Sequence, residues 1–371
     1  MTGTPIPFVD LAGQHAEVRE EVERGWAGVI ARTSFVLGPE VGAFETEFAA
    51  FSRLRHCIGV GNGTDALELA LRAAGIGPGD EVLVPANTFI ASVVAVERAG
   101  ATPVLVDSDA STHLIDVADA GHRVTARTRA IMPVHLFGQM APMAAVADLA
   151  QRHGLIVVED AAQSQGATQG EAPSGGWGLV SATSFYPGKN LGAYGDAGAV
   201  LTDDDDMADR VRRLRNYGSQ VKYHHPEIGF NSRLDTLQAV VLLAKLRRLG
   251  EWNQRRRDAA ARYGSLLSAL DVTLPVTAPG NQHVWHLYVI RVAERDRVLQ
   301  ELADEGIGVG IHYPVPVHLQ GACAHLGHQP GDFPVAEAAA QEILSLPMHP
   351  HLSPADQERV AESLAAALHR A

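Results

Sequence analysis

The side chain with the clearest chemical potential in this sequence is that of Lys189. It stands in SATSFYPGKNLGAYGDAGAV, in a glycine- and proline-rich loop between two strand-like runs. A lysine in such a loop is usually a solvated surface residue, but apolar and aromatic side chains flank this one: Phe185, Tyr186, Leu191 and Tyr194. These surroundings favour the uncharged amine, which Schiff-base chemistry with a carbonyl requires. The Tyr-x-x-Lys spacing is one residue short of the spacing that serves hydride chemistry in short-chain dehydrogenases.

A second candidate is Asp160, which ends the apolar run LIVVED at 155–160. A carboxylate at the rim of a sheet is partly desolvated and costs free energy unless a cation pairs with it. A protonated pyridine nitrogen is one such cation. The alternative is that Asp160 only caps a turn or a helix.

The segment IGVGNGTDALELAL at 58–71 offers a place for a phosphate. Gly61 and Gly63 allow a tight turn, and Thr64 or Asp65 can cap the helix that follows. The free N–H groups of a helix N-terminus bind anions. The same pattern also describes any loop that enters a helix. Its glycines do not form a dinucleotide-binding fingerprint.

The fourth candidate is GVGIHYPVPVHLQ, which places His312 and Tyr313 at the end of a predicted strand over 308–313. Each alone is typical of a structural residue. As a pair facing a cleft between domains, they offer two donors to a phosphate.

An alternation of short apolar runs and helical stretches must position these residues. Strand-like runs lie at 81–85, 102–107, 130–135 and 155–160, with helical stretches such as 64–74 and 143–153 between them. Two further strands, 181–185 and 198–202, flank the Lys189 loop. The pattern predicts an α/β fold with a mainly parallel central sheet, which binds ligands beyond the carboxyl ends of its strands.

The remainder of the chain predicts a second domain. A polar helical segment occupies 8–55, and residues 203–249 are helical and amphipathic. Residues 253–270 resemble a long exposed helix, followed by a strand over 283–292, a helix over 295–306 and a last helix after Ser353. We therefore expect a large domain over 1–250 and a smaller α+β domain over 251–371.

Composition excludes several classes of protein. The formal net charge of −13 disfavours nucleic acid and anionic membranes as partners. The two cysteines, Cys57 and Cys323, lack metal-ligand spacing and suit a reducing cytoplasm, so we expect no metal site and a cytoplasmic protein. We see neither a signal peptide nor a membrane-spanning run.

Together these motifs resemble the DegT/DnrJ/EryC1/StrS family of sugar aminotransferases. The series FVDLAGQ, FVLGPEVGAFE, GNGTDAL, EDAAQ, SFYPGKN, GFNSRLDTLQA, IHYP and SLPMHP runs in order through nearly the whole chain. The resemblance implies fold type I, pyridoxal 5'-phosphate (PLP) as cofactor, and transamination.

The resemblance also implies roles for individual residues. Lys189 holds the cofactor, Asp160 pairs with its pyridine nitrogen and Gln163 lies by its phenolic oxygen. The remaining roles are stacking on the pyridine face by Phe89, and phosphate binding by Gly63, Thr64 and Ser184. Asn231 reaches the phosphate of the neighbouring subunit, which implies a homodimer with shared active sites. The positions that contact the pyrophosphate of a nucleotide-linked sugar are Tyr186, Lys222, His312 and Tyr313.

The implied reaction moves an amino group, by family default from glutamate, to a nucleotide-linked keto sugar. Gln163 stands where many relatives that act at carbon 4 have histidine, which favours a dTDP-3-keto-6-deoxyhexose of amino-sugar and antibiotic biosynthesis. Gln165 departs from the histidine that three-position aminotransferases often carry there.

Two alternatives stay open: a keto-cyclitol aminotransferase of aminoglycoside assembly, and a non-catalytic PLP-binding regulatory protein. The presence of Lys189 and Asp160 weighs against the second alternative. Lys189 also weighs against a sugar dehydratase, because the relatives that dehydrate their sugar have histidine in place of this lysine.

Overall fold

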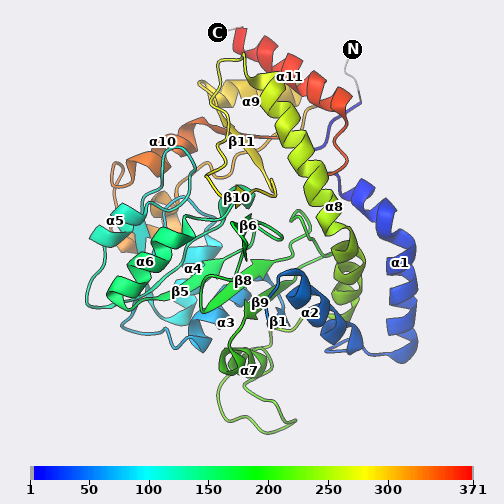
Figure 1. Ribbon diagram of the computed structural model, residues 1–371, viewed down its shortest axis with the longest axis vertical. Helices are drawn as coiled ribbons and strands as arrows, with labels where there is room; N and C mark the ends of the chain where they lie inside the picture. The colour runs from blue at the N-terminus through cyan, green and yellow to red at the C-terminus, as the bar shows by residue number, and fades with distance from the viewer. Residues whose placement is uncertain (1–3, 370–371) are drawn as a thin grey trace.

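A central sheet of seven strands forms the body of the protein, and the computed structural model describes residues 4–369 (Figure 1). The strands carry apolar, largely β-branched residues and are almost wholly buried, as expected of a sheet covered on both faces. Their order is β1-β9-β8-β5-β4-β2-β3. Their bounds are β1 His56–Val60, β2 Glu81–Pro85, β3 Thr102–Val106, β4 Thr128–Ile131, β5 Ile156–Asp160, β8 Val180–Ser184 and β9 Gly198–Thr202.

The sheet is mainly parallel, as predicted. Only β9 runs against its neighbours, pairing antiparallel with β1 and β8. The carboxyl ends of β5 and β8 therefore lie side by side at one edge of the sheet, with Asp160 opposite Ala182. Asp160 and the loop that follows β8 thus meet at the same edge.

Helices cover both faces of the sheet, which gives three layers (Figure 1). One face packs against α3 Gly63–Ala73, α4 Ala91–Ala99 and α7 Asp205–Leu214. The other face packs against α2 Pro39–Phe51, α5 Val117–His122, α6 Met143–His153 and the first part of α8 Thr236–Leu267. The predicted α/β fold is confirmed.

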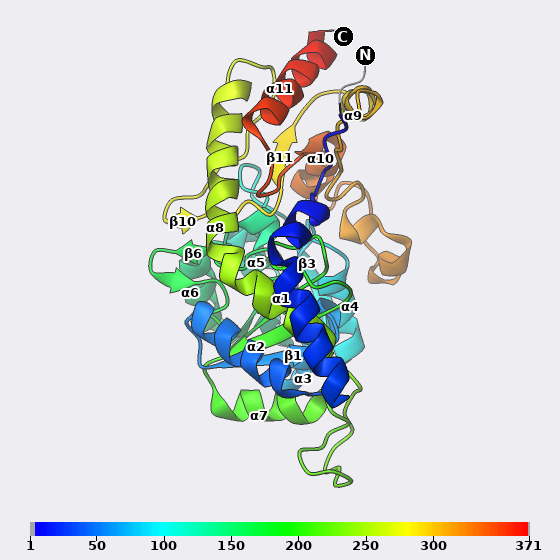
Figure 2. The ribbon, with the colours of Figure 1, turned by 90° about the vertical axis from the view of Figure 1, so that its right-hand side faces the viewer.

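The long helix α8 links this body to the C-terminal part of the chain. Helix α1, Leu11–Arg32, lies alongside it (Figure 2). The end of α8 packs in a second core with a two-stranded sheet and two helices: β11 Tyr288–Arg291, β12 Ile343–Leu346, α9 Arg295–Asp304 and α11 Pro354–His369. The predicted boundary at residue 250 would fall inside α8 and stays a prediction.

Short elements complete the chain. Strands β6 Thr168–Gln169, β7 Ala172–Pro173 and β10 Asn281–Gln282 form a small sheet. Helix α10 spans Pro334–Glu342, and 3-10 turns span Leu136–Gly138, Val317–Leu319 and Gly321–Leu326. No helix within residues 4–369 is both long and apolar enough to cross a membrane.

Three local predictions were wrong. Residues 308–313 do not form a strand, because Gly308 bonds to Ile6 while Gly310 bonds to Ser345, so no continuous ladder forms. The strand expected over 283–292 spans only Tyr288–Arg291. The helix over 253–270 is not simply exposed, because one face of α8, including Arg256 and Tyr263, is buried.

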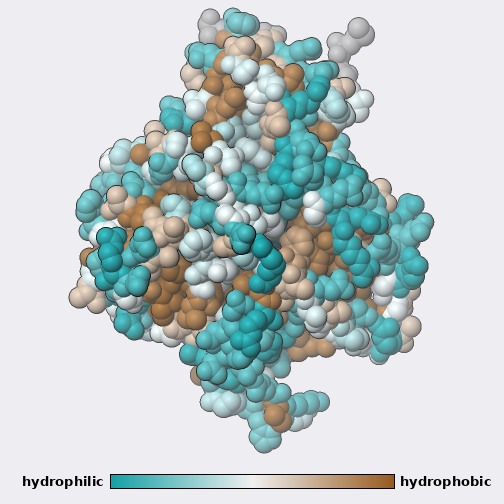
Figure 3. Space-filling view, viewed as in Figure 1, coloured by the Kyte–Doolittle hydropathy of each residue, from teal (hydrophilic) through white to brown (hydrophobic). Residues whose placement is uncertain are grey.

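The fourth difference concerns the helical stretch expected over 203–249. The segment 215–235 leaves the helix after α7 and projects from the molecule (Figure 1). Figure 3 shows it as largely hydrophilic, with hydrophobic atoms near its tip. Within this segment, Tyr223 and Ile228 are 80% and 94% exposed. Large apolar side chains this exposed are typical of a surface that another chain covers.

Candidate active site

Asp160 lies at the carboxyl end of β5 and is 4% exposed. Its carboxylate accepts hydrogen bonds from Ser92 Oγ at 2.8 Å and from the backbone N–H of Ala162 at 3.1 Å. Burial raises the pKa of Asp160, and these two hydrogen bonds and the charge of Lys189 oppose that rise. A buried carboxylate with so few donors attracts a cation.

The strand ends around Asp160 are fixed by a fully buried pair, Glu159 and His135. His135 Nδ1 accepts from the N–H of Ala141, so Nε2–H donates to Glu159 Oε2 at 2.8 Å. The Glu159 carboxylate also accepts from three backbone N–H groups, those of Gly175, Trp177 and Gly178. Glu159 points to the opposite side of the strand from Asp160 and thereby holds its backbone in place.

Lys189 follows β8 in a tight turn, where its N–H donates to the carbonyl of Tyr186 at 2.8 Å. Its side chain is half-buried. Burial lowers the pKa of Lys189 to about 8, while the nearby Asp160 charge opposes the shift. At that pKa about one Lys189 in ten is uncharged at pH 7. The lowered pKa agrees with the expectation that burial favours the uncharged amine of Lys189.

Side chains of helix α8 hold the Lys189 loop by hydrogen bonds. Lys245 Nζ donates to the carbonyl of Gly192 at 2.7 Å and lies 4.6 Å from the centre of the Tyr194 ring. Next to Lys189, the buried Asn190 amide donates to Asn253 Oδ1 and to the carbonyl of Val284, each at 2.9 Å. The sequence contains only three lysines, Lys189, Lys222 and Lys245. No local sequence pattern indicates that Lys245 positions the loop that carries Lys189.

The first turn of α3 meets the end of β8. A Cβ on Gly63 would lie 2.6 Å from Cβ of Ser184, so only glycine permits this approach. The cap of α3 is Asn62, whose Oδ1 accepts from the N–H of Asp65 at 2.8 Å, and not Thr64 or Asp65 as predicted. The N–H groups of Gly63 and Thr64 have no partner among the described residues, so this corner suits a phosphate.

Gln163, Tyr313 and Phe89 form a connected group. Gln163 Oε1 accepts from the N–H of Phe137 at 2.6 Å, and Gln163 Nε2 donates to the Tyr313 hydroxyl at 3.1 Å. The Tyr313 ring lies 5.4 Å from the ring of Phe89, which is 53% exposed. An exposed aromatic ring beside a buried polar group offers a flat surface to a planar ligand.

Two histidines lie near Lys189. His312 Nδ1 is 2.8 Å from Ser345 Oγ, and burial, with the Lys189 charge, lowers the pKa of His312 to about 4. His286, which the sequence did not single out, is half-buried, and desolvation together with the charge of Lys189 lowers its pKa well below the usual value. With a pKa of about 4, the His312 imidazole is neutral at pH 7 and offers a ligand an uncharged donor.

The structure does not bring Asn231 and Lys222 to this group. Both are exposed on the projecting segment 215–235, and within residues 4–369 neither bonds to Lys189, Asp160 or Gln163. Tyr186, beside Lys189 in sequence, is 59% exposed. The other residues named from the sequence gather at one edge of the sheet.

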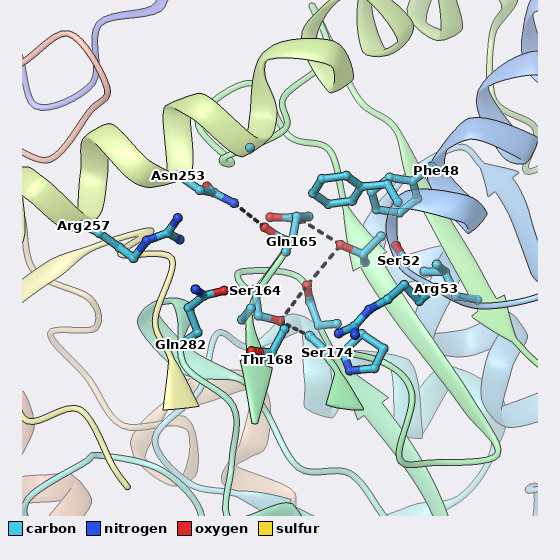
Figure 4. Close-up of a pocket in the computed structure, with 18 residues that line it drawn as sticks. Phe48, Ser52, Arg53, Ser164, Gln165, Thr168, Ser174, Asn253, Arg257 and Gln282 are labelled. Atoms are coloured by element: carbon cyan, nitrogen blue, oxygen red, sulfur yellow. Dashed lines mark hydrogen bonds between the residues drawn. The ribbon is translucent and has the colours of Figure 1, made fainter. Parts of the chain in front are cut away.

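Gln165 lines a separate cavity of about 390 Å³ (Figure 4). Arg53 and Arg257 flank it from two sides, and its described lining contains no carboxylate side chain. Gln165 Nε2 donates to Thr183 Oγ1 at 2.8 Å and to the carbonyl of Ser184 at 2.9 Å. Gln165 thus supports the end of β8 from the side opposite the Gly63 corner.

These features fit PLP by their chemistry. A buried carboxylate can pair with a protonated ring nitrogen, and an amine of lowered pKa can react with a carbonyl. The N–H groups of a helix N-terminus can bind a phosphate. The exposed ring of Phe89 and the amide of Gln163 complete a place for a flat polar ring.

Comparison with known proteins places this geometry in context. The sequence model of the DegT/DnrJ/EryC1/StrS aminotransferase family matches residues 16–365. The "Erythromycin biosynthesis sensory transduction protein EryC1" of Saccharopolyspora erythraea is 48% identical over 362 residues, 97% of this chain and 99% of that protein. The "dTDP-3-amino-3,4,6-trideoxy-alpha-D-glucose transaminase" of Streptomyces venezuelae is 48% identical over 360 residues, 97% of this chain and 95% of that enzyme.

Solved structures of similar fold support the same family assignment. The crystal structure of S. venezuelae DesV in complex with a ketimine intermediate has a TM-score of 0.97 and 47% identity, and the match covers 100% of both chains. Other structures of this fold have been solved with the cofactor in its pyridoxamine (PMP) and pyridoxal (PLP) forms.

The lowered pKa of Lys189 predicts how fast the cofactor-free protein takes up PLP. Because only the uncharged amine attacks a carbonyl, the rate should rise with pH and level off above about pH 8, the pKa of Lys189. Stopped-flow absorbance over a pH series measures this. Burial lowers the pKa of Lys245 to about 8 as well, so Lys245→Met tests whether Lys245 sets the midpoint. Uptake that still levels off near pH 8 in this variant assigns the midpoint to Lys189, even if loss of the Gly192 contact slows the rate. A midpoint near the usual 10.5 would contradict the assignment.

The Asn190 contacts predict a loss of stability. Asn190→Ala removes two donors and leaves the buried Val284 carbonyl unpaired, which should lower the free energy of unfolding by about 1–3 kcal/mol. Denaturant unfolding of the cofactor-free protein measures it. The exposed Gln151→Ala on α6 is the control and should change stability by less than about 0.5 kcal/mol. Equal effects would show that the contact does not hold the loop.

Proposed function

This chain belongs to the DegT/DnrJ/EryC1/StrS aminotransferase family, and from that premise we propose that it transfers an amino group from glutamate to a nucleotide-linked keto-deoxy sugar. The proposed acceptor is a dTDP-3-keto-6-deoxyhexose, and the proposed setting is amino-sugar and antibiotic biosynthesis. The observation that carries the proposal is the 48% identity, over 97% of this chain, to an enzyme named as a dTDP-amino-sugar transaminase.

The enzyme class and the cofactor need no proposal. The chain is a PLP-dependent aminotransferase of fold type I. The predicted family resemblance, fold and cofactor are therefore confirmed.

The assignment of cofactor contacts to individual residues is part of the proposal. Lys189 would hold the carbonyl carbon and Asp160 the pyridine nitrogen. Phe89 would cover one face of the ring, and Gln163 would lie by the phenolic oxygen. The phosphate would bind at the corner formed by Gly63, Thr64 and Ser184. The contacts described above support each position.

The chemistry follows from two side chains. PLP, when bound, acts as an electron sink for the substrate carbanion. The Asp160 carboxylate holds a proton on the pyridine nitrogen, and its burial strengthens that attraction. Once an amino substrate has displaced it, Lys189 would be a free amine that moves a proton between the substrate carbon that bears the nitrogen and the former carbonyl carbon of the cofactor. Its lowered pKa suits both the acidic and the basic role.

The pyrophosphate of the sugar nucleotide would meet donors from two chains. His312 and Tyr313 lie by Gln163 and Lys189 in the same chain, with Tyr186 exposed nearby. Lys222 would supply the positive charge, because His312 is neutral near pH 7. In a protein of net charge −13, such local donors are needed to bind a dianion.

A homodimer with shared sites is part of the proposal. Asn231 and Lys222 are assigned to ligand contact but make no bond to Lys189, Asp160 or Gln163 among the described residues, and both lie on the projecting segment 215–235. That segment exposes Tyr217, Val221, Tyr223 and Ile228 to an extent typical of an interface. A second exposed apolar run follows α1: Phe35, Val36 and Leu37. We infer that the segment of one subunit completes the site of the other.

We also propose a cytoplasmic location, which the two free cysteines support. The S. erythraea relative is named a sensory transduction protein, which corresponds to the non-catalytic alternative. The match to an enzyme named as a transaminase favours catalysis, and the buried Asp160 and the Lys189 amine of lowered pKa are groups that transamination would use.

The proposed substrate predicts that Lys222→Ala weakens binding of the sugar nucleotide without impairing the reaction with glutamate. Losing one charge-assisted contact to pyrophosphate costs about 1.5–3 kcal/mol, so KM for the sugar nucleotide should rise by about one to two orders of magnitude. The half-reaction with glutamate should hardly change. Stopped-flow measurement of both half-reactions decides it. His312→Ala should have a smaller effect, because the neutral His312 imidazole contributes a hydrogen bond but no positive charge. Equal damage to both half-reactions, or preferential turnover of a free keto-cyclitol, would contradict the proposal.

Shared sites predict complementation between two inactive variants. A hybrid of Lys189→Ala with Asn231→Ala contains one site with both native residues, so random exchange should restore about a quarter of the wild-type activity. Mass spectrometry of intact dimers verifies the exchange. Mixing Lys189→Ala with Asp160→Asn is the control, since both changes fall at one end of the site and the second chain keeps Asn231. That mixture leaves every site defective if Lys189 and Asp160 act within one chain. Verified exchange without recovery in the first mixture would exclude composite sites.

A further inference from the structure

Two motifs of the sequence, FVDL and SLPMHP, have no part in the site described above, and they meet away from it. Asp10 begins α1, while His349 and His351 lie in the turn before α11. The carboxylate and the two imidazoles bring one ligand atom each to within 4.8 Å of one another. We propose that Asp10, His349 and His351 bind a divalent transition-metal ion of the Zn²⁺ type.

His349 is the observation that points most directly to a ligand. It is 3% exposed, and neither of its ring nitrogens has a hydrogen-bond partner among the described residues. A buried polar group without a partner has lost its hydrogen bonds to water, so such groups are rare unless an ion or a water molecule meets them. Burial lowers the pKa of His349 to about 4, which leaves the imidazole neutral and able to donate a lone pair.

His351 is held in the orientation and tautomer that a metal ligand needs. Its Nε2–H donates to Glu17 Oε1 at 2.8 Å, so Nδ1 carries the free lone pair. Nδ1 is buried and has no partner within residues 4–369. Burial favours the neutral acid of Glu17, but hydrogen bonds from Trp252, Arg255 and His351 lower its pKa to about 2. A carboxylate behind a ligating histidine is the usual outer shell of protein zinc sites.

Asp10 supplies the third ligand. It is the N-cap of α1, and its Oδ1 accepts from the N–H of Gly13 at 2.8 Å. That bond fixes the carboxylate, while Oδ2 stays available to an ion. Nitrogen and carboxylate donors in this ratio suit Zn²⁺, which then keeps a fourth position for water. Zinc ligands bind at about 2.0–2.2 Å, so small side-chain rotations would bring the three atoms to the ion.

Acidic side chains outnumber the arginines around this place. After burial, Arg256 lowers the pKa of His349 most and His351 lowers it further, whereas Asp10 and Asp356 raise it. With the ionised Glu17, three carboxylates surround the two histidines, and Arg255 is already engaged by Glu17. An ion here would join the start of α1 to the segment before α11, two parts of the chain more than 300 residues apart in sequence. We therefore assign the site a role in stability and not in transamination.

Metal titration of the holoenzyme tests the proposal. Untagged protein freed of metals with a chelator should bind one Zn²⁺ per chain by calorimetry, checked by elemental analysis, and its melting temperature should rise with Zn²⁺. Asp10→Asn and His349→Gln should each weaken Zn²⁺ binding at least about 10-fold, and Glu17→Gln about 10–100-fold through His351. Tetrahedral Co²⁺, added in place of Zn²⁺, should give an intense visible band that Asp10→Asn loses.

The exposed His153→Gln on α6 is the matched control and should bind Zn²⁺ as the wild type does. Should His349→Gln fail to fold, Asp10→Asn and His351→Asn decide the question alone. The proposal is overturned if the wild type binds no stoichiometric Zn²⁺, or if the variants bind it as tightly as the control. Loss of binding in the variants with unchanged half-reactions would support it and leave the proposed function untouched.

Discussion

The rest of the structure depends on one constraint: Lys189 and Asp160 are held close together where burial shifts their pKa values in opposite directions. Burial favours the uncharged form of each group, so it lowers the pKa of the amine and raises that of the carboxyl. The charge of each group favours the ionised form of the other. A pair balanced in this way can give up its mutual attraction when a ligand brings a carbonyl to the amine and a cation to the carboxylate.

The fold serves this balance by fixing both ends of the pair. Asp160 ends a strand whose preceding residue, Glu159, is held by His135 and three backbone N–H groups. Lys189 lies in a loop that α8 holds through Lys245 and Asn253. Because α8 continues into the C-terminal core, the position of Lys189 is coupled to the region that carries His312 and Tyr313. Preorganisation of this kind lowers the cost of placing a reactive group.

The residues that could be predicted from the sequence are those whose sequence neighbours indicate their chemistry. An aspartate that ends an apolar strand and a lysine among aromatic residues were identified from their neighbours, and the mainly parallel sheet followed from the alternation of strands and helices. The residues that could not be predicted act through distant contacts. Lys245 and Asn190 matter because α8 packs against the loop, and His286 because it lies close enough to Lys189 to feel its charge. The strand expected at His312 failed because Gly308 and Gly310 bond to different partners, which no local pattern reveals.

The most direct test of this account is the identity of the lysine that holds the cofactor. Borohydride reduction of the yellow holoenzyme, followed by proteolysis and mass spectrometry, fixes PLP to one peptide. The chain makes the test sharp, because it has only Lys189, Lys222 and Lys245, and burial lowers the pKa of Lys245 to about 8 just as it does that of Lys189. We predict that the label appears on the peptide with Lys189 alone. A label on Lys245 or Lys222 would contradict it.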